Sequence, residues 1–154
     1  MIPILVESYL RQQEMPFEPI THPRVVSAQR LAAEEHVQGA RVAKPVVVSV
    51  DGLLAMAVVP ATRRVDLRAL SLAAGAAKVT LVPEQVFAER FWPCEPGAEP
   101  PISLFGMPLY VDAELAREPW VLMRGGTHED ALQVDTEDWL LSERCRVVEG
   151  LATT

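Results

Sequence analysis

The sequence predicts an α+β fold, a single domain in which helices and a mixed β-sheet share one core. Three observations support this prediction. The chain has 154 residues, of which 49% are hydrophobic, which suits one domain with a substantial interior. Residues 45–60 form a β-rich hairpin pattern, and helical patterns lie on both sides of it. No repeat, low-complexity segment or long linker divides the chain, so we expect residues 1–154 to form one domain.

The first forty residues predict two helices separated by an extended segment. Residues 2–13 place apolar side chains at helical spacing. They lack a basic lead and a small-residue cleavage site, so they read as an amphipathic helix and not as a signal peptide. Residues 16–20 are extended between prolines. Ser27 then caps a second helix that continues through Val37 and stops at Gly39.

The clearest pattern in the chain is the pair of β-rich runs within residues 45–60. Asp51 and Gly52 join the two runs, and this dipeptide strongly favours a tight hairpin turn. The apolar character is nearly continuous along both runs. We therefore expect strands that are covered on both faces.

The second half of the chain alternates helices with short strands. Asp66 begins a helix that Gly75 ends, and Pro83 opens another in its first turn. Five of the thirteen prolines fall in a long loop over residues 93–108. The remaining expected elements are strands at residues 78–82, 109–112, 120–124 and 131–134, and a closing helix at residues 135–145 with an acidic first turn.

Charge is distributed unevenly along the chain. The net charge of −7 argues against an extensive nucleic-acid footprint and gives no reason to expect DNA as a partner. Residues 1–78 carry nine basic and seven acidic residues, whereas residues 79–154 carry five and fourteen. A polyanion should therefore approach through the first half, where Arg41, Lys44, Arg63, Arg64 and Arg68 gather. A solvated surface with uneven charge is the alternative.

Cysteine usage and hydropathy exclude several classes of protein. Cys94 and Cys145 lie far apart and form neither a disulfide framework nor a zinc pattern, so we expect reduced thiols in a cytoplasmic protein. No apolar stretch reaches the length of a membrane span. Phosphate-binding glycine motifs and the G-x-S-x-G elbow are also missing.

Lys44 stands directly before Pro45, at the start of the apolar hairpin. Proline disfavours the α region for the residue before it, so Lys44 should be extended. Pro45 cannot donate a ladder hydrogen bond and belongs at a strand start or edge. Because an unpaired buried ammonium is costly, Lys44 should reach an anion, a carbonyl or a water-filled cavity. The alternative is a lysine that extends to solvent from a strand end.

Two further segments could contact a ligand. In residues 95–101, Gly97 permits conformations that other residues avoid, and the flanking prolines could hold backbone N–H groups in place for an oxyanion. In residues 124–130, two glycines precede Thr127 and His128, and His128 could form hydrogen bonds or transfer protons. The alternative for residues 95–101 is a rigid surface connection, and the alternative for residues 124–130 is a simple turn between two strands. His22 and His36 read as structural, Cys94 as a packing or surface residue, and the histidine spacing predicts no metal site.

Four blocks of sequence together resemble the YbaK/prolyl-tRNA-synthetase-associated domain family, the ProX-like aminoacyl-tRNA deacylases. They are "THPRVVSAQRLAAEEH", "GARVAKPVVVSVDGLLAMAVVPATRRVDL", "PGAEPPISLFGMPLYVD" and "GGTHEDALQV". The resemblance implies a strongly curved, barrel-like mixed sheet surrounded by helices. It also implies hydrolysis of the ester between a wrong amino acid and the terminal adenosine of a tRNA, without a metal or cofactor.

The resemblance also implies roles for individual residues. The family's lysine falls on Lys44, its G-x-x-x-P loop begins at Gly97, and the histidine of some members falls on His128. These three are the expected catalytic residues. The expected substrate-binding residues are Ala98, Pro101, Gly125, Gly126, Thr127, Arg41, Thr21 and His22. Water would be activated with help from the ribose hydroxyl of the substrate.

The expected function is therefore trans-editing in the cytoplasm, with alanine cleared from tRNA(Pro). The partners are the tRNA acceptor end and a prolyl-tRNA synthetase, with no membrane and no DNA. Pro45 and Ala43 depart from residues common in the family, and both could alter the pocket. The same activity on Cys-, Ser- or Thr-charged tRNA, a non-catalytic module that binds tRNA ends or a synthetase, and an unrelated small-ligand binder are the alternatives.

Overall fold

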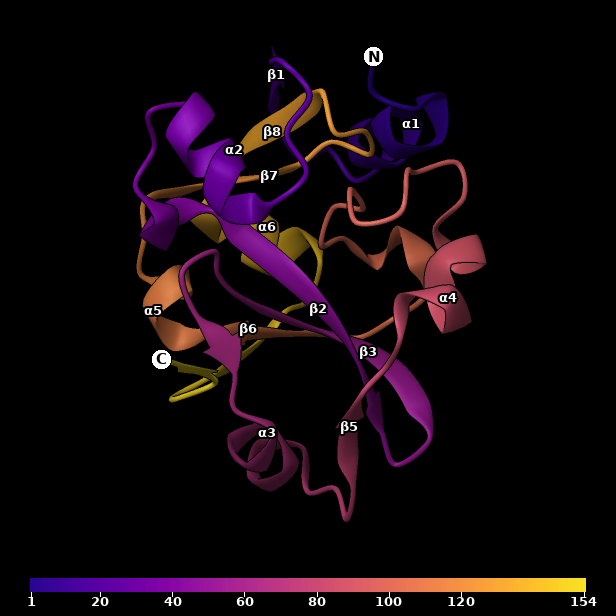
Figure 1. Ribbon diagram of the computed structural model, residues 1–154, viewed down its shortest axis with the longest axis vertical. Coiled ribbons are helices and arrows are strands. Elements are labelled where there is room, and N and C mark those ends of the chain that lie inside the picture. Colours follow the sequence, from indigo (N-terminus) through magenta and orange to yellow (C-terminus); the bar gives the residue numbers. More distant parts are fainter.

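The computed structural model describes residues 1–154 and has the predicted α+β class (Figure 1). The strands are β1 (Glu18–Thr21), β2 (Ala43–Val50), β3 (Leu53–Pro60), β4 (Arg64–Val65), β5 (Val79–Leu81), β6 (Leu109–Asp112), β7 (Trp120–Arg124), β8 (Asp130–Asp135), β9 (Arg146–Val148) and β10 (Ala152–Thr153). The helices are α1 (Ile4–Gln12), α2 (Ala28–Glu34), α3 (Leu67–Ala74), α4 (Glu84–Phe87), α5 (Ala113–Ala116) and α6 (Thr136–Ser142). Single 3-10 turns lie at Gly39–Arg41, Ala88–Phe91 and Ser103–Phe105.

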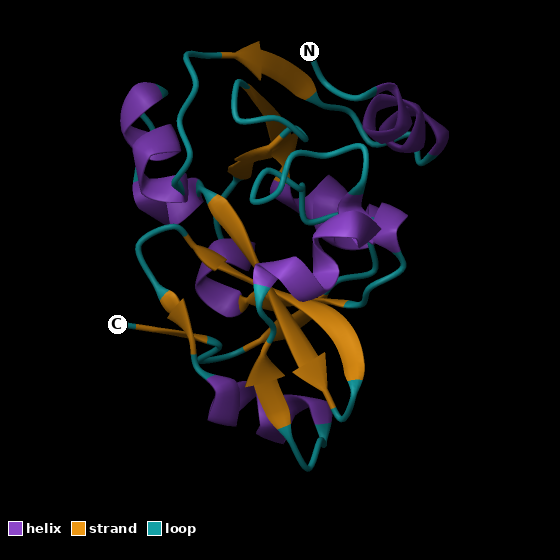
Figure 2. Cartoon of the chain, turned by 45° about the vertical axis from the view of Figure 1, so that its right-hand side comes forward, coloured by secondary structure: helices purple, strands orange, loops and turns teal.

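The strands form three sheets. The largest has the order β5-β2-β3-β6-β9 and is mixed, because β2 is antiparallel to β3 and β5 whereas β3-β6 and β6-β9 are parallel. The second is antiparallel, with the order β1-β8-β7, and β10 and β4 make a third of two strands. Figure 2 shows the long β2-β3 ribbon running through the middle of the molecule, with helices around it.

The barrel-like closure that the resemblance implied is wrong. A closed barrel needs a continuous ladder of paired strands around its circumference. The main sheet instead ends at β5 on one side and at β9 on the other. On its outer side β2 pairs with β5 only along residues 48–50, and the link between β2 and the second sheet is one isolated bridge from Val42 to Leu122. The sheet therefore stays open along the first half of β2.

The predicted hairpin is confirmed. Asp51 and Gly52 have φ angles of +49° and +88°, as expected for a two-residue turn with both central residues in the left-handed region. Successive residues of β3 alternate between two cores. Met56 and Val58 belong to the largest cluster, Ala57 and Val59 belong to the second, and all four are fully buried. The prediction that the hairpin is covered on both faces holds for β3.

The helices begin where local chemistry predicts. The Ser27 hydroxyl accepts the Arg30 N–H at 3.0 Å, Asp66 caps α3, and Gly75 ends α3 with a φ of +64°. The second helix ends earlier than expected, at Glu34, and the helix expected to begin at Pro83 divides into α4 and a 3-10 turn. None of the helices combines the length and the apolar character required to cross a bilayer.

Trp139 connects the closing helix α6 to the proline-rich loop. Its indole is fully buried, and its Nε1–H donates a hydrogen bond to the Pro101 carbonyl at 2.9 Å. Asp135 caps the same helix by accepting the Asp138 N–H. The loop is thus held at Pro101 by a buried hydrogen bond in addition to packing.

Trp139→Phe should lower the free energy of unfolding by about 1–3 kcal/mol, because the Pro101 carbonyl would lose its buried donor. Urea denaturation followed by circular dichroism measures this change. Leu141→Ala is the matched control on the same helix, since Leu141 is 73% exposed and its loss should change stability by no more than about 0.5 kcal/mol. Equal effects of the two substitutions would contradict the prediction.

Candidate functional site

A cavity of about 400 Å³ lies beside the first half of β2. In Figure 1, α2 and α4 stand on either side of this part of the strand. Ten of the sixteen lining residues are hydrophobic, so the few polar groups among them define its chemistry. Those polar side chains are Lys44, Glu84, Glu99 and Arg124, and Gly97 completes the wall.

The cavity follows the outer edge of β2 rather than one face of the sheet. Residues 42–47 all line it, although side chains in a strand alternate between two faces. The Val47 carbonyl accepts the Val82 N–H at 3.3 Å and points outward, whereas the Val42 carbonyl accepts the Ala61 N–H on the side of β3. By this alternation the Pro45 nitrogen also faces outward. Pro45 therefore removes no hydrogen bond between β2 and β3, as expected for an edge position.

Lys44 lines the cavity, but its ammonium is held on the side of the turn that follows β3. The Nζ donates to the Arg63 carbonyl at 2.6 Å and to the Ala61 carbonyl at 3.4 Å. Burial lowers the pKa of this ammonium. The sequence predicted that Lys44 would reach an anion, a carbonyl or a cavity, and it combines two of these. An ammonium has three protons, so one donor remains beyond the two carbonyl bonds.

Gly97 also lines the cavity, in a loop that the β7-β8 turn holds through two backbone hydrogen bonds. Gly126 donates its N–H to the Ala98 carbonyl and accepts the Glu95 N–H at its own carbonyl, both at 2.9 Å. The φ of Gly97 is +81°, in the region that favours glycine. The β7-β8 turn thus holds the backbone of this loop on both sides of Gly97.

The N–H groups of this loop are already occupied. The Gly97 N–H donates to Glu99 Oε2 at 3.0 Å, and the Ala98 N–H donates to the Glu95 carbonyl at 2.9 Å. Glu99 is 5% exposed, and burial raises the pKa of its carboxyl despite the N–H groups of Glu99 and Gly97. Any oxyanion that takes the Gly97 N–H must first displace the carboxylate of Glu99.

His128 holds the loop through a hydrogen bond to its backbone. Its Nε2–H donates to the Pro96 carbonyl at 2.9 Å, and its Nδ1 is buried without a partner. The ring lies against Gly97, since a Cβ built on Gly97 would be 3.5 Å from His128 Cε1. His128 is 4% exposed and does not line the cavity. Of the two roles expected for His128, the geometry provides the hydrogen bond.

Several expected substrate-binding residues lie outside the cavity wall. Ala98 and Pro101 are buried within the loop. Gly125, Gly126 and Thr127 belong to the β7-β8 turn. The Thr127 hydroxyl donates to Asp130 at 2.6 Å. Gly126 leaves no room for a side chain, because a Cβ there would lie 2.7 Å from Pro3 Cδ. These five residues belong to the loop and to the turn that holds it, and none of them lines the cavity.

The remaining expected residues lie on the second sheet and on the turn before β2. Thr21 ends β1 and borders a different hollow of about 660 Å³, between α1 and β1, that none of the cavity's polar side chains lines. His22 is buried with its Nδ1 at 2.7 Å from the Pro23 carbonyl. Arg41 pairs with Glu118 at 2.9 Å and stacks over Trp120.

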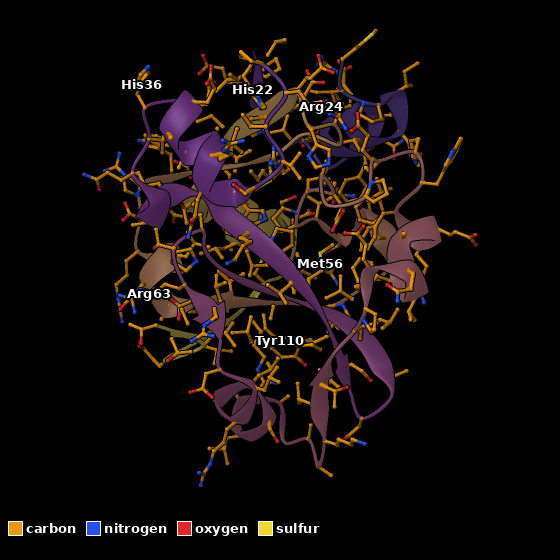
Figure 3. The ribbon with its side chains drawn as sticks, in the orientation of Figure 1. His22, Arg24, His36, Met56, Arg63 and Tyr110 are labelled. Carbon is orange, nitrogen blue, oxygen red and sulfur yellow. The ribbon has the colours of Figure 1, made fainter.

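The side chains that could serve as metal ligands are dispersed over the chain. His22 and His36 stand well apart in Figure 3, each on its own segment. No group of three or more His, Cys, Asp or Glu side chains is arranged to hold a metal ion.

Sequence reasoning missed Arg124 and Glu99. Arg124 is the last residue of β7, 4% exposed, and Glu99 lies two residues after Gly97. Charged residues at strand ends and in loops are usually solvated, so their type and spacing carried no signal. Only the approach of β7 to the loop and to β2 makes both of them line one cavity.

The family is decided by comparison with known sequences. The aminoacyl-tRNA editing domain matches residues 22–141, which is well over half of the chain. The chain belongs to the aminoacyl-tRNA editing domain family. This family implies aminoacyl-tRNA deacylase activity, with aminoacyl-tRNA as the substrate. No curated protein sequence matches the chain.

Solved structures confirm the fold of an editing domain. A hypothetical protein shares 19% identity at a TM-score of 0.86, with 97% of this chain and 99% of that chain covered. A candidate trans-editing enzyme for prolyl tRNA synthetase shares 17% identity at a TM-score of 0.83, with both chains fully covered. A candidate signal transduction protein from Marinobacter aquaeolei VT8 shares 20% identity at a TM-score of 0.74. The match covers all of this chain and 31% of that protein.

Both cysteines of this editing domain should be unreactive in the native state. Burial, with a smaller contribution from Glu99, raises the pKa of Cys94 to about 12, and burial beside Glu143 raises the pKa of Cys145 to about 12. Since the thiolate is the nucleophile, alkylation by iodoacetamide at pH 8 should be at least ~100-fold slower than in urea. Mass spectrometry of timed samples measures the rates. Rapid native labelling of Cys94 would contradict the buried placement.

Proposed function

We propose that this editing domain hydrolyses the ester bond of mischarged tRNA in trans, and that Ala-tRNA(Pro) is its substrate. The observation that carries the proposal is the cavity, on whose wall Lys44 and Gly97 both lie. The likeness to a candidate trans-editing enzyme for prolyl tRNA synthetase supports the choice of tRNA(Pro). The partners are the tRNA acceptor end and a prolyl-tRNA synthetase, and the reaction takes place in the cytoplasm.

The cavity suits the terminal nucleotide with a small amino acid attached. Its volume of about 400 Å³ lies within the range of small-molecule sites. Val26 and Leu81 line it and are 65% and 60% exposed, so they form an apolar rim against which the adenine can lie. The aminoacyl group then passes along the edge of β2 toward the Gly97 loop. Apolar walls limit the size of the side chain that can enter.

Lys44 and the loop contribute to this reaction in different ways. The two carbonyls fix the position of the Lys44 ammonium, and its remaining proton is available to a phosphate or to the 3′ end. The backbone hydrogen bonds of Gly126 and the hydrogen bond from His128 to the Pro96 carbonyl hold the Gly97 loop against the substrate. Water attacks the ester with help from the ribose hydroxyl of the substrate. His128 and the glycines of the turn act by positioning the loop.

Deacylation of tRNA charged with Ser, Cys or Thr is the second candidate. The observation that favours it is the presence of Glu84, Glu99 and Arg124 in the cavity wall, since these groups can hydrogen-bond a hydroxyl or thiol. A panel of tRNAs charged with each of these amino acids separates the candidates. A non-catalytic module would bind the acceptor end without releasing any amino acid.

Purified protein should release alanine from Ala-tRNA(Pro) and leave Pro-tRNA(Pro) intact. The expected difference is at least ~10-fold, which is what a pocket can achieve against one or two additional carbon atoms. Acid-precipitable radiolabel, followed over time at fixed ionic strength, measures the rates. Release of alanine at the spontaneous rate would defeat the proposal.

Lys44→Ala should reduce the release of alanine at least ~10-fold, because the substrate end would lose a fixed cation. Lys78→Ala is the matched control, since Lys78 is the other lysine of the chain and lines a small hollow at the tip of the β2-β3 hairpin instead. Initial rates at several substrate concentrations compare the two variants. If both variants retained the activity of the unmodified protein, Lys44 would have no part in the reaction.

A further inference from the structure

Arg124 is a buried cation without a partner. Its side chain comes from the last residue of β7, lines the cavity beside β2, and is 4% exposed. Both terminal nitrogens, Nη1 and Nη2, are buried and have no hydrogen-bond partner. The Glu95 and Glu99 carboxylates favour its charge, yet neither forms an ion pair with it.

Such an arrangement is costly unless a ligand completes it. A guanidinium stays protonated in proteins, so Arg124 cannot escape the cost of burial by losing its charge. Removing an ion from water without a partner costs several kcal/mol even after the protein relaxes. The two unpartnered nitrogens therefore identify a place in the cavity where an oxygen with negative charge or strong acceptor character would be stabilised.

The Gly97 and Ala98 N–H groups of the loop are already occupied. They donate to Glu99 and Glu95, and the prolines of the loop have no N–H. In ester hydrolysis the carbonyl oxygen gains negative charge as water adds, and donors that are already in place stabilise it. Of the donors in this cavity, the Arg124 guanidinium has two without any partner.

We propose that Arg124 is a catalytic residue whose guanidinium receives the carbonyl oxygen of the scissile aminoacyl ester. Water adds to the carbonyl carbon, and the electron pair of the C=O bond moves to the oxygen that faces Arg124. That pair then returns to reform the C=O bond, and the bond to the ribose oxygen breaks. The ribose oxygen takes the proton that the water gives up, and the free amino acid and the tRNA 3′ end leave. This role rests on the proposed deacylase function.

The depth of Arg124 argues for the ester rather than for the tRNA backbone. A side chain that is 4% exposed is out of reach of phosphates that remain at the surface. The acidic side chain of an aspartyl or glutamyl group is the other oxygen that could enter, and the experiment below distinguishes it.

Steady-state kinetics of Arg124→Met and Arg124→Lys on Ala-tRNA(Pro) test the proposal. Arg124→Met should lower kcat by about 100- to 1,000-fold, with KM within about three-fold, and Arg124→Lys should recover part of the loss. Arg90→Met is the matched control, because Arg90 is exposed and makes no ion pair. A kcat for Arg124→Met within about three-fold of the unmodified protein would overturn the role. So would Asp- or Glu-tRNA as the preferred substrate, with only that preference lost in Arg124→Met.

Two measurements without turnover keep the test independent of activity. Arg124→Met should melt at the same temperature as the unmodified protein or higher, because it removes an unpartnered buried charge. A lower melting temperature would show that Arg124 has a structural partner.

Adenosine carrying a 3′ alanine phosphonate imitates the charged tetrahedral oxygen, and its planar 3′ amide does not. Calorimetry should show at least ~10-fold preference for the phosphonate, and Arg124→Met should abolish it.

These measurements separate the two proposals. If the protein releases no alanine but prefers the phosphonate through Arg124, the deacylase function and the catalytic role of Arg124 both fail, and only an anion-binding site remains. If it releases alanine equally well with and without Arg124, the function stands and this inference fails. Absence of any phosphonate preference in the unmodified protein would also overturn the inference.

Discussion

The incomplete pairing of β2 is the constraint on which the site depends. On one side the strand pairs with β3 over its whole length, and on the other it pairs with β5 only along residues 48–50. The unpaired half leaves a row of backbone with a cavity beside it, and Pro45 keeps that row from offering a full set of donors to another strand. The same strand thus joins two hydrophobic cores and forms one wall of the site.

Most of the contacts that hold the loop come from residues outside the cavity wall. Gly126, His128 and Trp139 all bind carbonyls of the proline-rich loop, and none of them lines the cavity. The charged side chains that do line it are Lys44, Glu84, Glu99 and Arg124, and Gly97 lines it as well. Neighbouring elements thus hold the loop through its backbone carbonyls, and Glu99 is a cavity residue that also holds it, because its carboxylate accepts the Gly97 N–H.

Sequence patterns predicted the features that depend on near neighbours. The Asp51-Gly52 turn, the Ser27 and Asp66 caps and the edge position of Pro45 each follow from chemistry within a few residues. Short elements such as β4, β9, β10 and α5 were not predicted, because they exist only through contacts with distant strands. Arg124 was missed for the same reason. Its burial depends on β7, α2 and the loop coming together, and the occupied Gly97 N–H depends on how Glu99 folds back.

Two of the arginines near β2 already lie against carboxylates. Arg41 pairs with Glu118, and Arg63 lies 3.8 Å from Glu114. Figure 3 shows Arg63 at the margin of the molecule, on the turn between β3 and β4. When a nucleic acid approaches, each phosphate replaces a carboxylate, and the freed carboxylate attracts a cation from solution. The net release of ions is then smaller than these two arginines alone would give, so the affinity of any contact at this margin should depend less on salt.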